Sequence, residues 1–222
     1  MLRAVLFDFD GLILDTETPE VQILREMFAD FGQEFPDEYW IQALGRGADR
    51  LLDPPMVFLQ KMCGRTLDCD ALEKERRRQT EALIDLEPVR PGIRELLLEI
   101  RQRKLLAGIA SSSMHSWVEG HLKRLGLFEV FDKIVCADDV QNAKPAPDLY
   151  LKLIQELGVG PEECFALEDS PNGIKGAKVA GLRVVAVETP LSRRLDLSEA
   201  DAKLPSLAGM GSDQLWELVS NH

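Results

Sequence analysis

From residue 88 onward, strand and helix patterns alternate along the chain, and this alternation is the strongest constraint on the fold. Short apolar runs, typical of buried strands, occupy residues 105–110, 134–137, 164–167 and 184–187. Apolar residues recur at helical spacing in 93–100, 115–125, 147–157 and 174–180, and a last helix is expected around 215–219. Strict alternation predicts βαβ units, and therefore a parallel sheet with helices on both faces.

The first part of the chain has a different pattern. The apolar run at residues 2–7 predicts another buried strand, but residues 16–85 contain no credible strand signal. Helical patterns cover 18–31, 56–62 and 70–83, with a short helix expected around Trp40 and a break at Pro54-Pro55. We therefore expect an α/β chain with a core of residues 1–15 and 86–222, interrupted by an all-helical cap at 16–85.

Composition limits the possible partners. The chain has 222 residues and a formal net charge of −12, so it should repel nucleic acid and anionic membranes. The one basic run, Arg76-Arg77-Arg78, is flanked by glutamates at helical spacing and predicts a solvated helix face. No apolar run is long enough to span a bilayer, and the first residues lack a signal-peptide pattern. The four cysteines form no CxxC pair, so we expect a protein of the reducing cytoplasm, a monomer by default.

Two aspartates, Asp8 and Asp10, directly follow the first strand, and the apolar residue Phe9 separates them. Because Phe9 points the other way, both carboxylates can face one cavity. Gly11 follows, where the backbone can bend sharply or approach a ligand closely. Buried carboxylates need a compensating cation, and Mg²⁺ binds carboxylates together with phosphate oxygens. The stretch predicts Mg²⁺-assisted phosphoryl transfer, with a solvated Asp-x-Asp turn as the alternative.

Polar residues also follow the strands that end near residues 110, 137 and 167. In open α/β sheets, ligands bind beyond the carboxyl ends of the strands, so these side chains should converge at one edge. The residues expected there are Asp8, Asp10, Ser111, Asp138, Lys144, Glu168 and Asp169.

Phosphoryl transfer assigns a role to each acid. It needs an in-line nucleophile and neutralisation of the charge on the phosphate oxygens. Asp8 can attack phosphorus, and Asp10 can protonate the leaving oxygen and later accept a proton from water. Asp8, the backbone carbonyl of Asp10 and Asp169 can hold Mg²⁺. Glu168 can act as a ligand through water or support the other ligands.

The phosphate itself would be held by other groups at this edge. Ser111 and the backbone N–H groups after it, including that of Ser112, can bind phosphate oxygens beside the start of the next helix. Lys144 can supply a positive charge to the phosphate and to Asp8. Simpler interpretations exist: Ser111 can be a helix N-cap, Lys144 a solvated loop residue, and Glu168-Asp169 a cap for the following helix.

Four segments of the chain resemble the four motifs of the haloacid dehalogenase-like hydrolases. The subgroup that looks closest contains β-phosphoglucomutase, phosphoglycolate phosphatase and small sugar-phosphate phosphatases. The matching segments are FDFDGLILDTE at 7–17, IASSS at 109–113, NAKPAPD at 142–148 and LEDSPNG at 167–173. The resemblance implies a Rossmann-like core, Mg²⁺, an aspartyl-phosphate intermediate and Asp10 as the acid–base residue. Dehalogenases of this family lack the second aspartate and need no metal, so Asp10 and Asp169 argue against carbon–halogen chemistry here.

Departures from the family pattern bear on the substrate. β-Phosphoglucomutases have a histidine shortly after the first motif, where this chain has Thr18-Pro19-Glu20, so we favour a phosphatase of small phosphomonoesters over a mutase. In the cap, Arg46 and Arg50 are candidate substrate-binding residues, with a solvated loop as the alternative. A protein that binds a phosphorylated metabolite without turning it over is the third hypothesis, although all the catalytic positions are filled.

Overall fold

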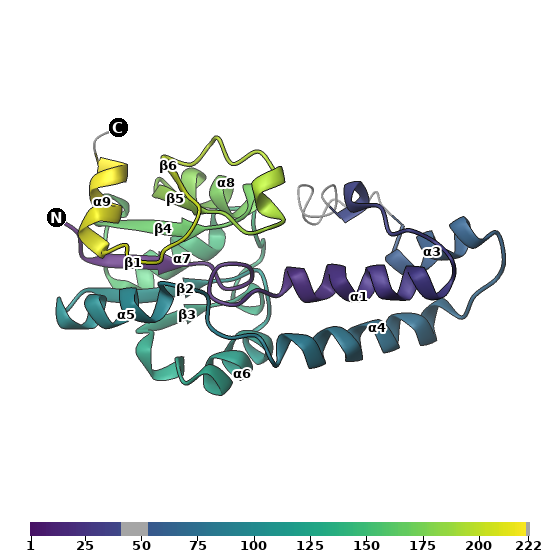
Figure 1. Cartoon of the computed structure of the whole chain (residues 1–222). Coiled ribbons are helices and arrows are strands. Elements are labelled where there is room, and N and C mark those ends of the chain that lie inside the picture. Colours follow the sequence, from purple (N-terminus) through teal and green to yellow (C-terminus); the bar gives the residue numbers. More distant parts are fainter. Residues whose placement is uncertain (41–52, 221–222) are drawn as a thin grey trace. The chain divides into compact units, whose positions relative to one another are not determined.

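The computed structural model describes residues 1–40 and 53–220 (Figure 1). These residues form two compact units, one made of Met1–Leu14 with Pro88–His222 and the other of Asp15–Glu87. Arg46 and Arg50, the predicted substrate-binding arginines, and the end of the short helix predicted around Trp40 lie outside the described residues.

The first unit is built on a six-stranded sheet with the strand order β3-β2-β1-β4-β5-β6, in which every neighbouring pair is parallel. The predicted Rossmann-like α/β fold is therefore confirmed. β1 lies between β2 and β4, with Phe7 opposite both Ile109 and Leu167. The strands are β1 (Ala4–Phe7), β2 (Leu106–Ala110), β3 (Lys133–Val135), β4 (Cys164–Glu168), β5 (Arg183–Val187) and β6 (Ala202–Leu204).

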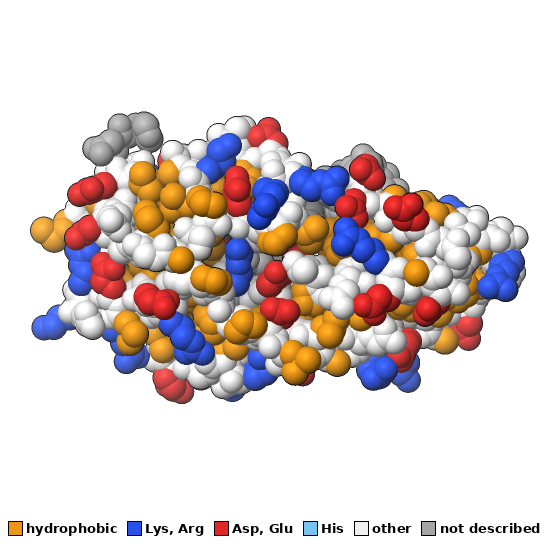
Figure 2. Space-filling view, in the orientation of Figure 1, with side chains coloured by type: hydrophobic (Ala, Val, Ile, Leu, Met, Phe, Trp, Pro, Cys, Tyr) orange, Lys and Arg blue, Asp and Glu red, His pale blue; other side chains and the backbone are white. Residues whose placement is uncertain are grey.

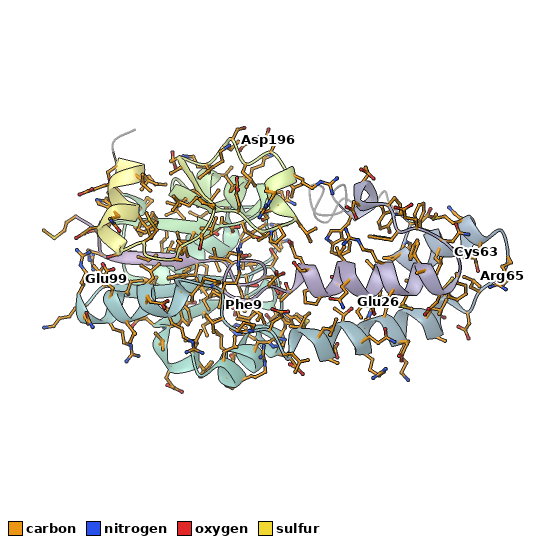
Figure 3. All side chains as sticks on the ribbon, in the orientation of Figure 1. Phe9, Glu26, Cys63, Arg65, Glu99 and Asp196 are labelled. Atoms are coloured by element: carbon orange, nitrogen blue, oxygen red, sulfur yellow. The ribbon has the colours of Figure 1, made fainter. Side chains whose placement is uncertain are left out.

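Side-chain alternation along the strands creates two buried layers. Ala4 and Leu6 of β1 belong to the apolar cluster that also contains residues of α7 (Asp148–Leu157) and α8 (Pro171–Val179). On the other face, Phe165 of β4 packs against Trp216 of α9 (Ser212–Ser220), and α9 contacts α5 (Ile93–Gln102). Glu99 of α5, labelled in Figure 3, accepts a hydrogen bond of 2.7 Å from Ser212 Oγ at the start of α9. Helices therefore cover both faces, as the alternation predicts.

Most predicted elements lie within one or two residues of the observed ones. α6 (His115–Leu125) begins and ends at the predicted residues, and Gly126 ends it with a φ of +68°. α8 begins at Pro171, three residues earlier than its apolar pattern, because Ser170 caps it by accepting a hydrogen bond from the Gly173 N–H. β6 has no counterpart in the prediction.

The second unit, Asp15–Glu87, is helical throughout its regular structure in the described part of the chain. It contains α1 (Glu17–Asp30), α3 (Pro55–Cys63) and α4 (Cys69–Ile84), and α4 packs against both other helices. Pro54 and Pro55 lie at the start of α3, where a missing N–H costs nothing.

The basic run on α4 differs from its prediction. Arg77 and Arg78 are exposed, but Arg76 is buried and forms ion pairs with Glu20 of α1 and with Glu73, the latter at 2.7 Å. The expected solvated face is therefore wrong for Arg76. Its guanidinium instead joins two helices of this unit, a contact that helical spacing alone does not reveal.

Charge is mixed on the part of the molecular surface that Figure 2 shows. On the face in view in Figure 2, Lys and Arg side chains are interspersed with Asp and Glu. Within the described ranges, 1–40 and 53–220, no helix is both long and apolar enough to cross a membrane.

Candidate active site

The candidate site lies at the carboxyl edge of the sheet, where β1 and β4 end side by side. β2 and β3 extend the sheet on one side of β1, and β4 to β6 extend it on the other. This change of direction is the topological switch point at which open α/β sheets bind ligands. Asp8 follows β1, and its N–H donates to Leu167 O of β4 over 3.0 Å. Glu168 is the last residue of β4 and Asp169 follows it, so acids from distant parts of the sequence become neighbours.

Three carboxylates form the centre of the site. Asp8, Glu168 and Asp169 are all buried, and one oxygen from each lies within 4.8 Å of the others. Lys144 Nζ lies 2.5 Å from Asp8 Oδ1 and 2.7 Å from Glu168 Oε1, and it donates to Ala110 O over 2.7 Å. The Tyr150 hydroxyl donates to Glu168 Oε1 over 2.5 Å. Charge-assisted hydrogen bonds therefore join Lys144 to Asp8 and to Glu168, and Tyr150 to Glu168.

Burial and the charges of neighbouring groups together determine the protonation of this cluster. It raises the pKa of Asp8 to about 8, against the attraction of Lys144 and with added repulsion from Glu168 and Asp10. Burial also opposes the charged form of Lys144, but the carboxylates of Asp8 and Glu168 prevail and hold its pKa above the ordinary value. Burial, followed by the charge of Glu168, raises the pKa of Tyr150 well above its usual range, so its hydroxyl remains a donor.

The residues present fit a divalent cation. Three buried carboxylates against one ammonium leave a formal charge of −2, and hard oxygen ligands are those that Mg²⁺ prefers. Gly11 adds a shape argument, because a Cβ there would lie 2.0 Å from Asp169 Oδ2. The backbone after β1 thus approaches the acids closely only because residue 11 has no side chain, and its φ of +80° also favours glycine.

Asp10 is directed toward α6 and the loop that precedes it. Trp117 Nε1 donates to Asp10 Oδ1 over 2.9 Å, and Ser113 Oγ lies 2.7 Å from Asp10 Oδ2. Its carboxylate is not one of the three that cluster within 4.8 Å, but its charge acts on Asp8. The loop holding it is fixed by Arg90, whose guanidinium donates to Gly11 O and to Glu188 O.

Ser111, Ser112 and Asp138 complete the predicted edge. Ser111 is fully buried at the end of β2, and its Oγ accepts from the Ser113 N–H over 3.0 Å. Ser112 is the next residue of the same loop and is exposed. Asp138 lies apart from the carboxylate cluster and accepts from the His115 N–H over 3.1 Å, at the start of α6. Asp138 therefore lies at the start of α6, and it forms a second group together with His115 and Cys136.

Three residues of the site were not predicted from the sequence: Ser113, Trp117 and Tyr150. Ser113 follows the predicted pair Ser111-Ser112, and the run of three serines is its one signal. Trp117 lies on α6 and Tyr150 on α7. The apolar pattern of each segment predicts a helix, but it does not predict that these side chains form polar contacts in the site. Both act through the polar atom of a large aromatic side chain, and sequence spacing does not predict where that atom lies.

Comparison with known proteins agrees with this architecture. Residues 5–187 match the haloacid dehalogenase-like hydrolases. The Bacillus subtilis (strain 168) protein YhcW is 41% identical over 210 residues, covering 95% of this chain and 94% of its own length. Hexitol phosphatase B of Escherichia coli (strain K12) is 30% identical over 223 residues, covering 96% of each chain.

Solved structures extend the likeness to three dimensions. The structure of CbbY from Rhodobacter sphaeroides in complex with phosphate has a TM-score of 0.72 and 28% identity, covering 97% of this chain and 99% of that one. The structure of β-phosphoglucomutase from Clostridium difficile has a TM-score of 0.74, covers 100% and 98%, and at 24% identity supports the fold alone. Because the family match includes β1, the strand-end acids and Lys144, the chain belongs to the haloacid dehalogenase-like hydrolase family.

Proposed function

We propose that this chain is a magnesium-dependent phosphatase that hydrolyses small, sugar-phosphate-like phosphomonoesters through an aspartyl-phosphate on Asp8. The observation that carries the proposal is the position of Asp8, buried at the switch point with Lys144 and two further carboxylates around it. The related hexitol phosphatase B, whose name states a phosphatase activity, supports the same reaction class.

The chain's own residues account for the two chemical steps. Asp8 attacks phosphorus, and the bond between phosphorus and the leaving oxygen breaks as Asp10 protonates that oxygen. Water then attacks the aspartyl-phosphate, Asp10 accepts its proton, and the Asp8 carboxylate and inorganic phosphate are released. Lys144 holds Asp8 in place and offers positive charge near the phosphate.

Asp8, Asp169, the backbone carbonyl of Asp10 and, directly or through water, Glu168 would hold the Mg²⁺. When bound, the cation neutralises phosphate charge and favours the ionised form of Asp8. This matters because burial, together with the charges of Glu168 and Asp10 and against that of Lys144, raises the pKa of Asp8 to about 8, which would leave much of the nucleophile protonated at neutral pH.

The helical unit, residues 15–87, is our candidate for the cap that selects the substrate, with Arg46 and Arg50 as candidate contacts. Ser111, the Ser112 N–H and the Gly11 backbone are the candidate phosphate contacts. We favour a phosphatase over a mutase because Thr18-Pro19-Glu20 lacks the histidine of the mutase pattern. The four cysteines are free thiols, and the cytoplasm is our proposed location.

A phosphate-release assay with Mg²⁺ tests the proposal on phosphoglycolate, hexose phosphates and nucleotide-derived phosphates. We expect steady release from at least one sugar phosphate, and a loss of about a thousandfold or more in Asp8→Asn. Asp138→Asn, in the turn between β3 and the candidate site's Lys144, should keep wild-type rates, because Asp138 lies apart from the carboxylate cluster. Binding without release would favour the phosphometabolite-binding protein, and interconversion of glucose 1-phosphate and 6-phosphate without net release would favour the mutase.

A further inference from the structure

Each carboxylate oxygen of Asp10 has a hydrogen-bond partner of its own, and the mechanism above does not use these partners. Trp117 Nε1 lies 2.9 Å from Oδ1, while Ser113 Oγ lies 2.7 Å from Oδ2. Ser111 Oγ is 3.5 Å from the same Oδ2, a longer and weaker contact. The side chains of Trp117 and Ser113 both bond to Asp10, and neither residue belongs to the buried carboxylate cluster.

Packing fixes the position of the Trp117 ring. The indole meets the His121 ring edge-on at a centroid distance of 4.3 Å. His121 is buried and stacks on Phe9 at 6.4 Å, and Phe9 is the fully buried residue between Asp8 and Asp10. Phe9, labelled in Figure 3, lies just beyond the end of β1. The indole N–H is therefore held toward Asp10 by the same packing that orients the strand end.

The two partners differ in their chemistry. An indole N–H can only donate, whereas a serine hydroxyl can donate or accept. Asp10 Oδ1 must therefore accept from Trp117 in either protonation state. Oδ2 can carry a proton without losing a hydrogen bond, because the Ser113 hydroxyl can turn from donor to acceptor.

We propose that Trp117 and Ser113 are positioning residues that fix the Asp10 side chain and confine its exchangeable proton to Oδ2. The inference rests on the proposed phosphatase function and assigns the geometry of its acid–base step. In the first step, the proton leaves Oδ2 for the leaving oxygen as the phosphorus–oxygen bond breaks, giving an alcohol and an Asp10 carboxylate. In the second step, the proton of the attacking water returns to Oδ2 as the bond from phosphorus to Asp8 breaks.

The dependence on the leaving group tests this assignment. An alkoxide needs protonation to leave, whereas p-nitrophenolate is a stable anion and does not. We would measure kcat/KM, which reports the first phosphoryl transfer, for p-nitrophenyl phosphate and an alkyl ester. As the alkyl ester we would use whichever of glycerol 3-phosphate, glucose 6-phosphate and phosphoglycolate the wild-type chain hydrolyses fastest. Trp117→Phe, which keeps a ring against His121, should lower the alkyl value about tenfold or more and the aryl value by less than about threefold.

Matched variants separate positioning from loss of structure. Trp216→Phe, on α9 against Phe165, should leave the ratio of the two kcat/KM values unchanged. Ser113→Ala should shift the ratio in the same direction as Trp117→Phe, and Ser113→Thr, which restores a hydroxyl, should bring it back toward the wild-type value.

Two results would overturn the proposal in distinguishable ways. Equal losses on both substrates in Trp117→Phe, or no loss on either, would show that Trp117 does not act through Asp10, while the phosphatase activity of the wild-type chain would stand. No phosphate release by the wild-type chain from any of these esters would overturn the phosphatase function and this assignment together.

Discussion

Lys144 presents one positive charge to two buried carboxylates, at 2.5 Å from Asp8 and 2.7 Å from Glu168. A buried ion pair contributes little net stability when intact, but removing one partner is costly because the remaining charge has lost both water and its counter-ion. Lys144 therefore has a structural role in addition to its proposed role in binding phosphate.

Lys144→Met should lower the free energy of unfolding by about 3–5 kcal/mol in EDTA, because Asp8 and Glu168 lose their common counter-ion. Excess Mg²⁺ should restore part of this loss by binding the folded state. Urea denaturation with and without Mg²⁺ measures both effects. Lys178→Met is the control, because Lys178 pairs with Asp201 at 2.7 Å but is one-third exposed, and its loss should cost about 0–1 kcal/mol. Equal losses in the two variants would contradict the prediction.

Gly11→Ala should weaken Mg²⁺ binding, since the new Cβ would lie 2.0 Å from Asp169 Oδ2 and displace that carboxylate. Gly32→Ala is a matched control, because Gly32 also has a positive φ, +70°, but nothing within 4 Å of the added carbon. Both variants should lose about 1–2 kcal/mol through backbone strain. Isothermal titration with Mg²⁺ should show at least about tenfold weaker binding in Gly11→Ala alone, and unchanged binding there would refute the close approach.

At the residue scale, the sequence predicted the acids better than their partners. Asp8 and Asp169 could be predicted to lie close together because each directly follows a buried strand, and strand ends of a parallel sheet converge. Ser113 and Trp117 contact Asp10 across 103 and 107 residues, and no spacing rule relates such positions. Tyr150 was missed for the same reason. The helical pattern explains why its ring is buried, but it does not predict that its hydroxyl donates to Glu168.

Individual elements show where periodicity succeeds and where it fails. The buried strands β1, β2, β4 and β5 are apolar on both faces and could be predicted from continuous apolar runs. β6 was missed because Ala202–Leu204 is short, only partly buried, and carries the exposed Lys203. It lies at the edge of the sheet and pairs with β5, where burial imposes little pattern on the sequence.

The residue that caps the start of α8 lies next to the acids of the candidate site. Ser170 accepts from the Gly173 N–H over 3.1 Å and lies next to Asp169. Ser170→Ala should destabilise the chain by about 1 kcal/mol through the lost N-cap, and it should also weaken Mg²⁺ binding because the preceding acids lose their anchor. Asp68→Ala removes the equivalent cap of α4, where Asp68 accepts from the Ala71 N–H over 3.0 Å, and should affect stability alone. Urea denaturation and Mg²⁺ titration of both variants separate the two effects; equal Mg²⁺ affinity in them would count against the anchoring role.

On the scale of the whole molecule, a chain with a net charge of −12 gathers three buried carboxylates at one point of its sheet. Such a concentration of charge is stable only with compensation, of which Lys144 supplies one unit. Cation binding should therefore stabilise the folded chain as well as support the proposed reaction.

Removing Mg²⁺ with EDTA should abolish phosphate release, and added Mg²⁺ should restore it. The same addition should raise the free energy of unfolding by about 2.7 kcal/mol when Mg²⁺ is at a hundred times its dissociation constant. Thermal unfolding with increasing Mg²⁺ measures this, and Asp169→Asn should remove most of the effect. Full activity in excess EDTA would show that the cluster has no catalytic cation.

The order of the strands in the sheet has a consequence for synthesis on the ribosome. β1 is translated first, but its neighbour β4 begins at Cys164 and brings Glu168 and Asp169 with it. A nascent polypeptide stalled before that point has Asp8 and Lys144 but lacks both acids opposite them. The proposed magnesium site therefore remains incomplete until β4 has been made, and we expect magnesium affinity to appear only when β4 pairs with β1.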